Sequence, residues 1–196
     1  MSKLLVVGGA TGAQGRATIK YFQQHEPSWQ IRGLTRTSQS KAALALADSG
    51  VEIAEADLND VESLKSAFKG ANYIFGYTDF AGIVKGPEVM GSFEAGELAA
   101  PIGAESYKIE LQQGKNIADA AATVPELDRL VFSALPGVKQ LSDGKFTQVF
   151  HFDAKAEAFE YMLSIPALKG KASAVQMGAF VTNAINGLDL FKHNKV

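Results

Sequence analysis

Residues 4–22 are LLVVGGATGAQGRATIKYF, and this stretch decides the fold class. A short apolar run leads into three glycines spaced three apart, Gly9, Gly12 and Gly15, and a second apolar run follows at helical spacing. The continuously apolar run indicates a buried strand, and the later spacing indicates an amphipathic helix. Gly9 permits a tight turn out of the strand, and Gly15 lets the helix pack closely against it.

The backbone amides of this glycine turn predict a pyrophosphate site. Gly12 lets the backbone approach a ligand, and the unpaired N–H groups at the helix start lie at the positive end of the helix dipole. A P-loop for nucleoside triphosphates is excluded, because no Gly-Lys-Ser/Thr follows at the required spacing. The turn opens a repeated strand–helix pattern, which favours a dinucleotide site over a glycine-rich turn without a ligand.

The rest of the chain alternates short apolar runs with longer amphipathic ones. Six strands separated by helices predict an α/β fold, a Rossmann-like doubly wound parallel sheet with helices on both faces. Strands are expected at 3–8, 30–35, 51–55, 73–77, 129–133 and 172–177. Helices are expected at 13–24, 40–49, 61–68, 107–122, 152–164 and 182–192.

Local signals refine this pattern. Asn59 is expected to cap the helix at 61–68, with Glu62 completing a capping box. Two segments, 79–106 and 136–153, have no firm period and are expected to be irregular. Both leave the carboxyl ends of strands, where doubly wound sheets bind ligands. The first is expected to be mobile without a ligand.

The composition excludes several classes of protein. A net charge of −2 without blocks of like charge predicts neither direct nucleic-acid binding nor a membrane surface. The absence of cysteine excludes disulfides and cysteine-ligated metal. His25 and His193 have no partners at metal-ligand spacing, so no metal site is expected. We expect a cytoplasmic or nuclear protein.

The end of the second predicted strand bears on the choice of dinucleotide. A site that prefers NAD places an acidic residue there, and no acidic residue lies between Arg32 and Ala47. Arg36 stands just past the strand instead, and a guanidinium binds a 2′-phosphate with two hydrogen bonds. Further donors follow at Ser38, Ser40 and Lys41. NADP(H) is therefore favoured, with NAD weaker; the alternative is a solvated basic loop.

The sequence resembles the NmrA-like family, an atypical branch of the short-chain dehydrogenase/reductase superfamily. The resemblance runs from about residue 3 to about residue 185, and its matching segments occur in the family's order. They are GGATGAQG, LTR, GVEIAEADLNDVESLKSAFKGANYIF, TDF, QGKNIADAA, LVFSALPG, HFDAKAE and MGAFVTN. The resemblance implies a single NAD(P)-binding domain over 1–196, with 178–196 the start of a C-terminal lobe that the family normally continues.

The resemblance also implies roles for individual residues. Gly9, Ala10, Thr11, Gly12, Ala13, Gln14 and Gly15 would wrap the pyrophosphate, and Arg36 would meet the 2′-phosphate. Asp57 and Leu58 would flank the adenine, Thr78, Asp79 and Phe80 the ribose and nicotinamide, and Lys155, Phe180 and Asn183 would lie near the nicotinamide. The alternatives are that Asp57 leads into the Asn59 cap and that Phe80 and Phe180 are core aromatics.

The catalytic pattern of classical short-chain dehydrogenases is missing. Their Tyr-x-x-x-Lys pair lowers the pKa of the phenol, and none of the five tyrosines has a lysine four residues later. The chain has His151-x-x-x-Lys155 in the equivalent place, so His151 could pass a proton while Ser133 polarises a carbonyl. The alternative is that Lys155 only holds the cofactor ribose and His151 fills a helix terminus. Ala134 stands where relatives often carry a second serine.

Two functions remain open. The first is a redox-sensing or cofactor-sensing regulatory protein, in which NADP(H) occupancy changes affinity for a protein partner such as a transcription factor. The second is an NADP-dependent reductase of a small carbonyl, imine or quinone. The missing Tyr-x-x-x-Lys pair and the curtailed C-terminal lobe favour the first.

Overall fold

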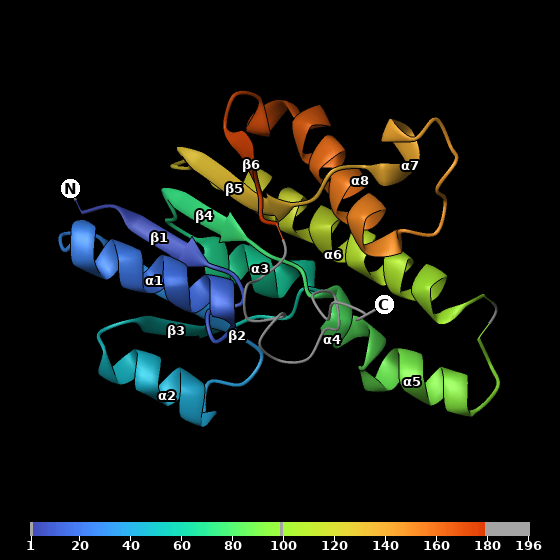
Figure 1. The fold of residues 1–196 in the computed structure, drawn as a ribbon. Coiled ribbons are helices and arrows are strands. Elements are labelled where there is room, and N and C mark those ends of the chain that lie inside the picture. Colours follow the sequence, from blue (N-terminus) through green and yellow to red (C-terminus); the bar gives the residue numbers. More distant parts are fainter. Residues whose placement is uncertain (1, 99, 179–196) are drawn as a thin grey trace, which may run out of the picture.

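A computed structural model describes residues 2–98 and 100–178 (Figure 1). Its six strands form one parallel sheet, as the sequence predicted, and their order is β3-β2-β1-β4-β5-β6. The strands are β1 Leu4–Val7, β2 Gln30–Thr35, β3 Glu52–Glu55, β4 Tyr73–Gly76, β5 Arg129–Ala134 and β6 Ala172–Gln176. The order reverses at β1, so the chain winds outward from the centre in both directions.

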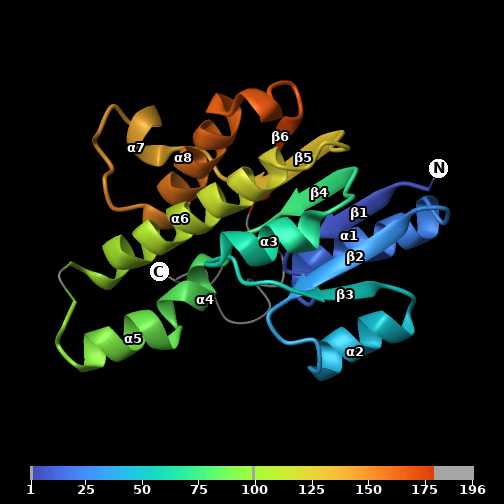
Figure 2. The same ribbon diagram turned by 180° about the vertical axis from the view of Figure 1, so that it is seen from behind.

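Helices connect successive strands. They are α1 Ala13–His25, α2 Lys41–Asp48, α3 Val61–Phe68, α4 Phe80–Val84, α5 Pro87–Glu94, α6 Ile102–Ala122, α7 Val138–Leu141 and α8 Phe150–Ser164. A short 3-10 turn, Pro166–Leu168, precedes β6. Helix α1 lies in front of the sheet in Figure 1, and α3 lies in front of it when the molecule is turned (Figure 2).

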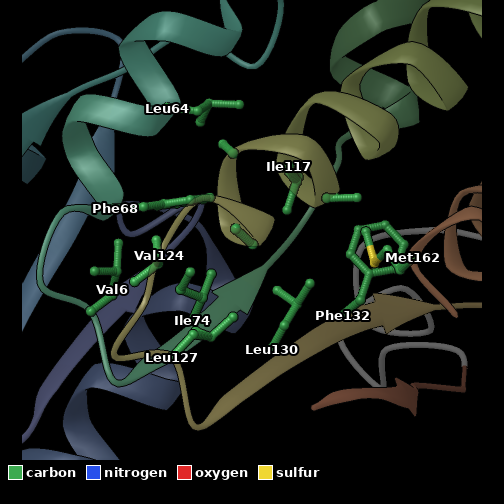
Figure 3. Packing of buried hydrophobic residues seen from close by; sticks show 14 of the residues in the cluster. Val6, Leu64, Phe68, Ile74, Ile117, Val124, Leu127, Leu130, Phe132 and Met162 are labelled. Atoms are coloured by element: carbon green, nitrogen blue, oxygen red, sulfur yellow. The ribbon is translucent and has the colours of Figure 1, made fainter. Parts of the chain in front are cut away.

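Each face of the sheet has its own apolar core. Val6 of β1 packs in a cluster with residues of α3, α6 and α8, whereas Val7 packs with residues of α1 and α2 on the other face. In the larger core, Phe68 of α3 and Ile117 of α6 point toward the strands, and Met162 of α8 belongs to the same cluster as Phe132 of β5 (Figure 3). Burial of β1 on both faces explains its continuously apolar sequence. The prediction of helices on both faces is confirmed.

Helix boundaries differ from the predictions at the starts of α6 and α8. Helix α6 begins at Ile102 rather than at 107, and α8 begins at Phe150 rather than at 152. The segment 79–106 is not irregular, because it contains α4, α5 and the first turn of α6. Asp79 caps α4 by accepting from the Gly82 amide (3.1 Å), and Pro87 opens α5. Likewise, α7 lies within 136–153.

The prediction that Asn59 caps α3 is wrong. Asp60 is the N-cap, and its carboxylate accepts from the Glu62 amide at 3.0 Å and the Ser63 amide at 3.3 Å. The Asn59 side chain instead accepts a hydrogen bond from Gln113 of α6 at 3.0 Å. The helix is thus capped by the residue after the predicted one, while Asn59 serves a contact with α6.

Part of the prediction lies outside the described residues. The helix at 182–192 and the lobe beginning at 178, apart from Gly178 itself, belong to this part. Among the described residues, none of the helices has the length and apolar character needed to cross a membrane. The same residues contain no cluster of three or more histidine and acidic side chains suited to a metal ion.

Candidate dinucleotide site

The glycine loop, residues 8–15, leaves the carboxyl end of β1 and opens α1. Gly9 adopts a φ of +59°, and a Cβ there would collide with the ring of Tyr77. Gly12 is the N-cap of α1 and has no side-chain cap, so the amides of the first turn are not covered by a capping side chain. The loop therefore presents free donors at a helix N-terminus, as a pyrophosphate site requires.

Gly12 and Gly15 have different surroundings. Gly12 is exposed, and a Cβ there would lie 3.2 Å from the Gly9 carbonyl oxygen. Gly15 is buried, and a Cβ there would overlap the Gly9 carbonyl and the Ala10 Cα. Gly15 thus serves the packing of α1 on the loop, whereas a Cβ on the exposed Gly12 would meet a single atom, the Gly9 carbonyl oxygen. The remaining predicted loop residues Thr11, Ala13 and Gln14 lie in the same turn, and Gln14 Oε1 is buried without a partner among the described residues.

The predicted adenosine end, residues 35–41 with 55–58, lies at the carboxyl ends of β2 and β3. Arg36 and Lys41 are exposed, and Ser40 caps α2 by accepting from the Ala43 amide (3.2 Å). The parallel register pairs Thr35 with Glu55. The Glu55 carboxylate accepts from the Ser38 amide at 2.7 Å, and this hydrogen bond lowers its pKa.

Glu55 adds a negative charge beside the loop after β2, for which the sequence suggested only basic and hydroxyl side chains. No acidic residue lies between Arg32 and Ala47 in the sequence, but strand pairing brings Glu55 from β3 to the loop after β2. A negative charge thus lies beside the segment expected to hold the 2′-phosphate. An acid at the end of the next predicted strand was the available signal, but which residue it meets depends on the strand register.

The residues predicted to flank the adenine have structural partners. Asp57 Oδ1 accepts from the Asn59 amide at 2.8 Å, and the Asp57 amide donates to Ser63 Oγ at 3.0 Å. The Leu58 carbonyl accepts from Asn116 of α6 at 2.8 Å. Asp57 therefore shapes the turn into α3, and its contact with adenine stays a prediction.

The predicted nicotinamide end, residues 77–80 with Glu110, His151 and Lys155, contains a buried charge network. Lys155 Nζ of α8 donates to the Thr78 carbonyl at 2.8 Å, to Thr78 Oγ1 at 2.7 Å and to Glu110 Oε1 of α6. Thr78 Oγ1 in turn donates to Glu110 Oε1 at 2.9 Å. Glu110 is fully buried and Lys155 is 8% exposed. All three ammonium protons of Lys155 thus have partners within the chain.

Burial perturbs the titratable groups around this network. Desolvation raises the pKa of Glu110, against the opposing effects of Lys155 and Thr78. Desolvation, with the charges of Asp79 and Glu110, raises the pKa of Tyr77 to about 12. The Tyr77 ring faces Gly9 and its centroid lies 5.8 Å from Lys155 Nζ, so it links the network to the glycine loop.

His151 lies near this network, on the surface of α8. Its ring centroid is 5.5 Å from that of Phe80, and the side chain is exposed. Partial burial, and then the positive charge of Lys155, lower its pKa. Ser133 is buried at the end of β5. The structure thus joins Thr78 to Lys155 and Phe80 to His151, whereas Phe180 and Asn183 lie outside the described residues.

Sequence reasoning missed Glu110 and Tyr77. Glu110 lies on the α6 face that also buries Ser106, Gln113 and Ile117, so helical spacing places it in the core. An acidic residue at such a position calls for a buried partner, and this was the available signal. Tyr77 gave no local signal, because its position over Gly9 depends on the pairing of β1 with β4.

Comparisons with known proteins identify the family. The sequence model of the NmrA-like family matches residues 1–195. The chain belongs to the NmrA-like family. The NmrA-like family domain-containing oxidoreductase FrzB of Cladobotryum sp is 31% identical over 146 residues, which cover 74% of this chain and 38% of that protein. Its counterpart ptmS of Penicillium ochrochloron is 28% identical and covers 92% of this chain and 48% of its own. The chain spans less than half the length of these NmrA-like relatives.

Solved structures confirm the fold. NmrA, a negative transcriptional regulator, has a TM-score of 0.66 at 20% identity over 93% of this chain and 48% of its own. A complex of NmrA with NAD gives the same TM-score. The triphenylmethane reductase of Citrobacter sp. in complex with NADP(H) has a TM-score of 0.62 at 18% identity, over 92% of this chain and 51% of its own. The fold is thus shared by an NmrA-like regulator and by a reductase.

Proposed function

We propose that this NmrA-like chain binds a nicotinamide dinucleotide along the carboxyl edge of its sheet. The observation that carries the proposal is the glycine loop, whose exposed Gly12 and missing side-chain cap leave the first-turn amides of α1 available to a phosphate. Relatives of the same fold were solved with NAD and with NADP(H), which supports the same ligand class here. The bound nicotinamide would supply hydride-transfer chemistry.

The preferred dinucleotide in this proposal is NADP(H). Arg36 is exposed just past β2 and free to turn toward a 2′-phosphate, and Ser38 and Lys41 flank it. Glu55 opposes this preference, because its carboxylate accepts from the Ser38 amide. The preference is therefore expected to be moderate, with NAD bound more weakly rather than rejected.

The role we propose is that of a cofactor-sensing regulatory protein. The support comes from the nicotinamide end, where the three protons of Lys155 are engaged by Thr78 and Glu110. The pKa of Tyr77 moves up to about 12, the opposite of the shift that prepares a tyrosine as an acid–base catalyst near neutral pH. Sensing requires that the occupied site favour one arrangement of the neighbouring chain, and the segment 79–106 is the candidate.

A reductase is the second candidate, and His151 favours it. The imidazole is exposed beside Phe80, where it can reach a ligand and donate a proton, although its lowered pKa leaves less of the protonated form near physiological pH. The relatives FrzB and ptmS are named oxidoreductases, although this chain covers less than half of each. In this reading His151 would exchange the proton that accompanies hydride transfer.

Two experiments test both roles. Calorimetric titration measures binding of NADPH and NADH, and a subsequent assay measures NADPH oxidation with a panel of carbonyls, imines and quinones. The sensor proposal expects binding with negligible oxidation, unchanged affinity in His151→Ala and slower hydrogen exchange in 79–106 with NADPH. Turnover that is lost in His151→Ala, with a pH dependence near the histidine pKa, would establish the reductase instead. Absence of binding to either dinucleotide would overturn both.

A further inference from the structure

Three separate elements build the buried charge network at the nicotinamide end. Lys155 comes from α8, Glu110 from α6, and Thr78 from the connection between β4 and α4. Helices α6 and α8 pack closely here, since a Cβ on Gly114 of α6 would overlap the Ala158 side chain of α8. The pair is therefore held in place by the packing of the helices that carry it.

Stability alone does not account for this ion pair. Desolvation of two buried charges costs about as much as their attraction returns, and apolar residues of similar volume are often as stable. Glu110 Oε2 has no hydrogen-bond partner among the described residues, nor does Ser106 Oγ one turn earlier on α6. A carboxylate with one unpaired oxygen in the core indicates a function other than folding.

The position of the pair points to such a function. Lys155 Nζ contacts both the carbonyl and the hydroxyl of Thr78, so it fixes this residue through main chain and side chain. The preceding residue, Tyr77, packs on Gly9 of the glycine loop. A displacement of Thr78 would therefore shift the Tyr77 ring, which abuts the glycine loop. It would also shift the first residues of the predicted nicotinamide end.

We propose that Glu110 is a positioning residue of the dinucleotide site. Its carboxylate holds the Lys155 ammonium against Thr78 and thereby sets the β4–α4 connection on which the nicotinamide half of the ligand rests. The inference rests on the proposed dinucleotide binding. In this arrangement Glu110 is the ion-pair partner of Lys155 within the chain. Lys155 therefore acts on the ligand through Thr78 and through its positive charge.

Glu110→Gln tests this inference, because glutamine keeps the shape of the side chain and removes its charge. Affinity is measured by calorimetry for two probes, NADPH and adenosine 2′,5′-bisphosphate, which lacks the nicotinamide half. We expect the dissociation constant of NADPH to rise about tenfold, the effect of losing one charged hydrogen bond. Affinity for the bisphosphate should stay within about twofold of wild type, because the adenosine end is untouched.

Two further variants separate positioning from folding. Ser106→Ala changes another buried polar side chain on the same face of α6 and should leave both affinities unchanged. The double variant Glu110→Met/Lys155→Met replaces the ion pair with apolar side chains and leaves no unpaired charge, so it should be more stable than Lys155→Met, although Thr78 loses its partners. It should still bind NADPH about tenfold more weakly.

Wild-type affinity for NADPH in Glu110→Gln or in the double variant would show that the pair is purely structural and would overturn the inference. An equal loss of affinity for both probes would also overturn it, because the effect would not be confined to the nicotinamide end. If the wild-type chain bound neither probe, the proposed function itself would fail.

Discussion

Charged side chains at the predicted adenosine end lie in water, whereas the Lys155–Glu110 ion pair at the predicted nicotinamide end lies inside the protein. Arg36, Lys41 and Glu55 are exposed and stand on two neighbouring segments at the ends of β2 and β3. Lys155 and Glu110 are buried and come from two helices that are distant in sequence. The same edge of one sheet thus carries two electrostatic environments.

This difference separates the consequences of mutation at the two ends. Exposed charges are screened by water and salt, so changes at the adenosine end should alter ligand choice with little effect on stability. Buried charges interact strongly and are costly when unpaired, so changes at the nicotinamide end should alter stability as well as binding. The following four experiments test this division, from the largest expected effect to the smallest.

Lys155→Met should lower the free energy of unfolding by about 3–5 kcal/mol, the typical effect of leaving one member of a buried ion pair without its partner. Loss of the ammonium raises the pKa of Glu110 further above its unfolded value. The stability contributed by a raised carboxyl pKa is present below the unfolded pKa and is lost as pH rises, so the deficit should be smaller at low pH than near neutrality.

Urea unfolding of Lys155→Met at acidic and neutral pH measures this effect. Lys108→Met is the matched control, because Lys108 also lies on a helix and pairs with Glu105 but is 63% exposed in its side chain. The control should change stability by less than about 1 kcal/mol. An equal effect of the two substitutions would contradict the division between the ends.

Gly12→Val should weaken binding of both NADPH and NADH at least about a hundredfold, because the side chain would occupy the space expected for the pyrophosphate. The fold should persist, since Gly12 is exposed and has an extended backbone that valine adopts readily. Gly15→Ala is the contrasting variant and should lower the melting temperature, because its Cβ would overlap the Gly9 carbonyl. Full binding by a folded Gly12→Val protein, measured by calorimetry, would mean that the phosphates lie elsewhere.

Arg36→Ala should lower affinity for NADPH about tenfold and leave affinity for NADH nearly unchanged, because only NADPH carries the 2′-phosphate. Calorimetry with both dinucleotides gives the two constants. The thermal stability of the variant should match that of wild type, since Arg36 is exposed. Equal affinities for NADPH and NADH in the wild-type chain would show that Arg36 does not select between them.

Glu55→Gln should increase the preference for NADPH over NADH by about threefold, with a smaller effect at higher salt, because it removes an exposed negative charge. Glutamine keeps an oxygen that accepts from the Ser38 amide, so the loop after β2 should retain its geometry. Parallel titrations at two salt concentrations measure the change. A lower affinity for NADPH would indicate that Glu55 acts by shaping the loop.

Much of the fold was predictable from local sequence. The strand at 30–35 and the helix at 61–68 have the predicted bounds, and the glycine loop opens α1 at Ala13 as expected. These features follow from neighbouring residues, through apolar runs and helical spacing. The short helices α4 and α5 were missed, because each has only one or two turns and contains a glycine, Gly82 or Gly91, that obscures any period.

The amino-acid sequence alone was enough to indicate the family, the parallel sheet and the glycine loop, since each depends on short local patterns: one strand–turn–helix unit for the loop, and the repetition of such units and of matching segments along the chain for the sheet and the family. It could not reveal that Glu110 faces Lys155 across α6 and α8, or that Glu55 stands beside Ser38. Those contacts join residues 45 and 17 positions apart, and they exist only because helix packing and strand register bring the chain together. Charges act over a few ångströms of space rather than along the chain, so the electrostatics of this site belong to the tertiary structure.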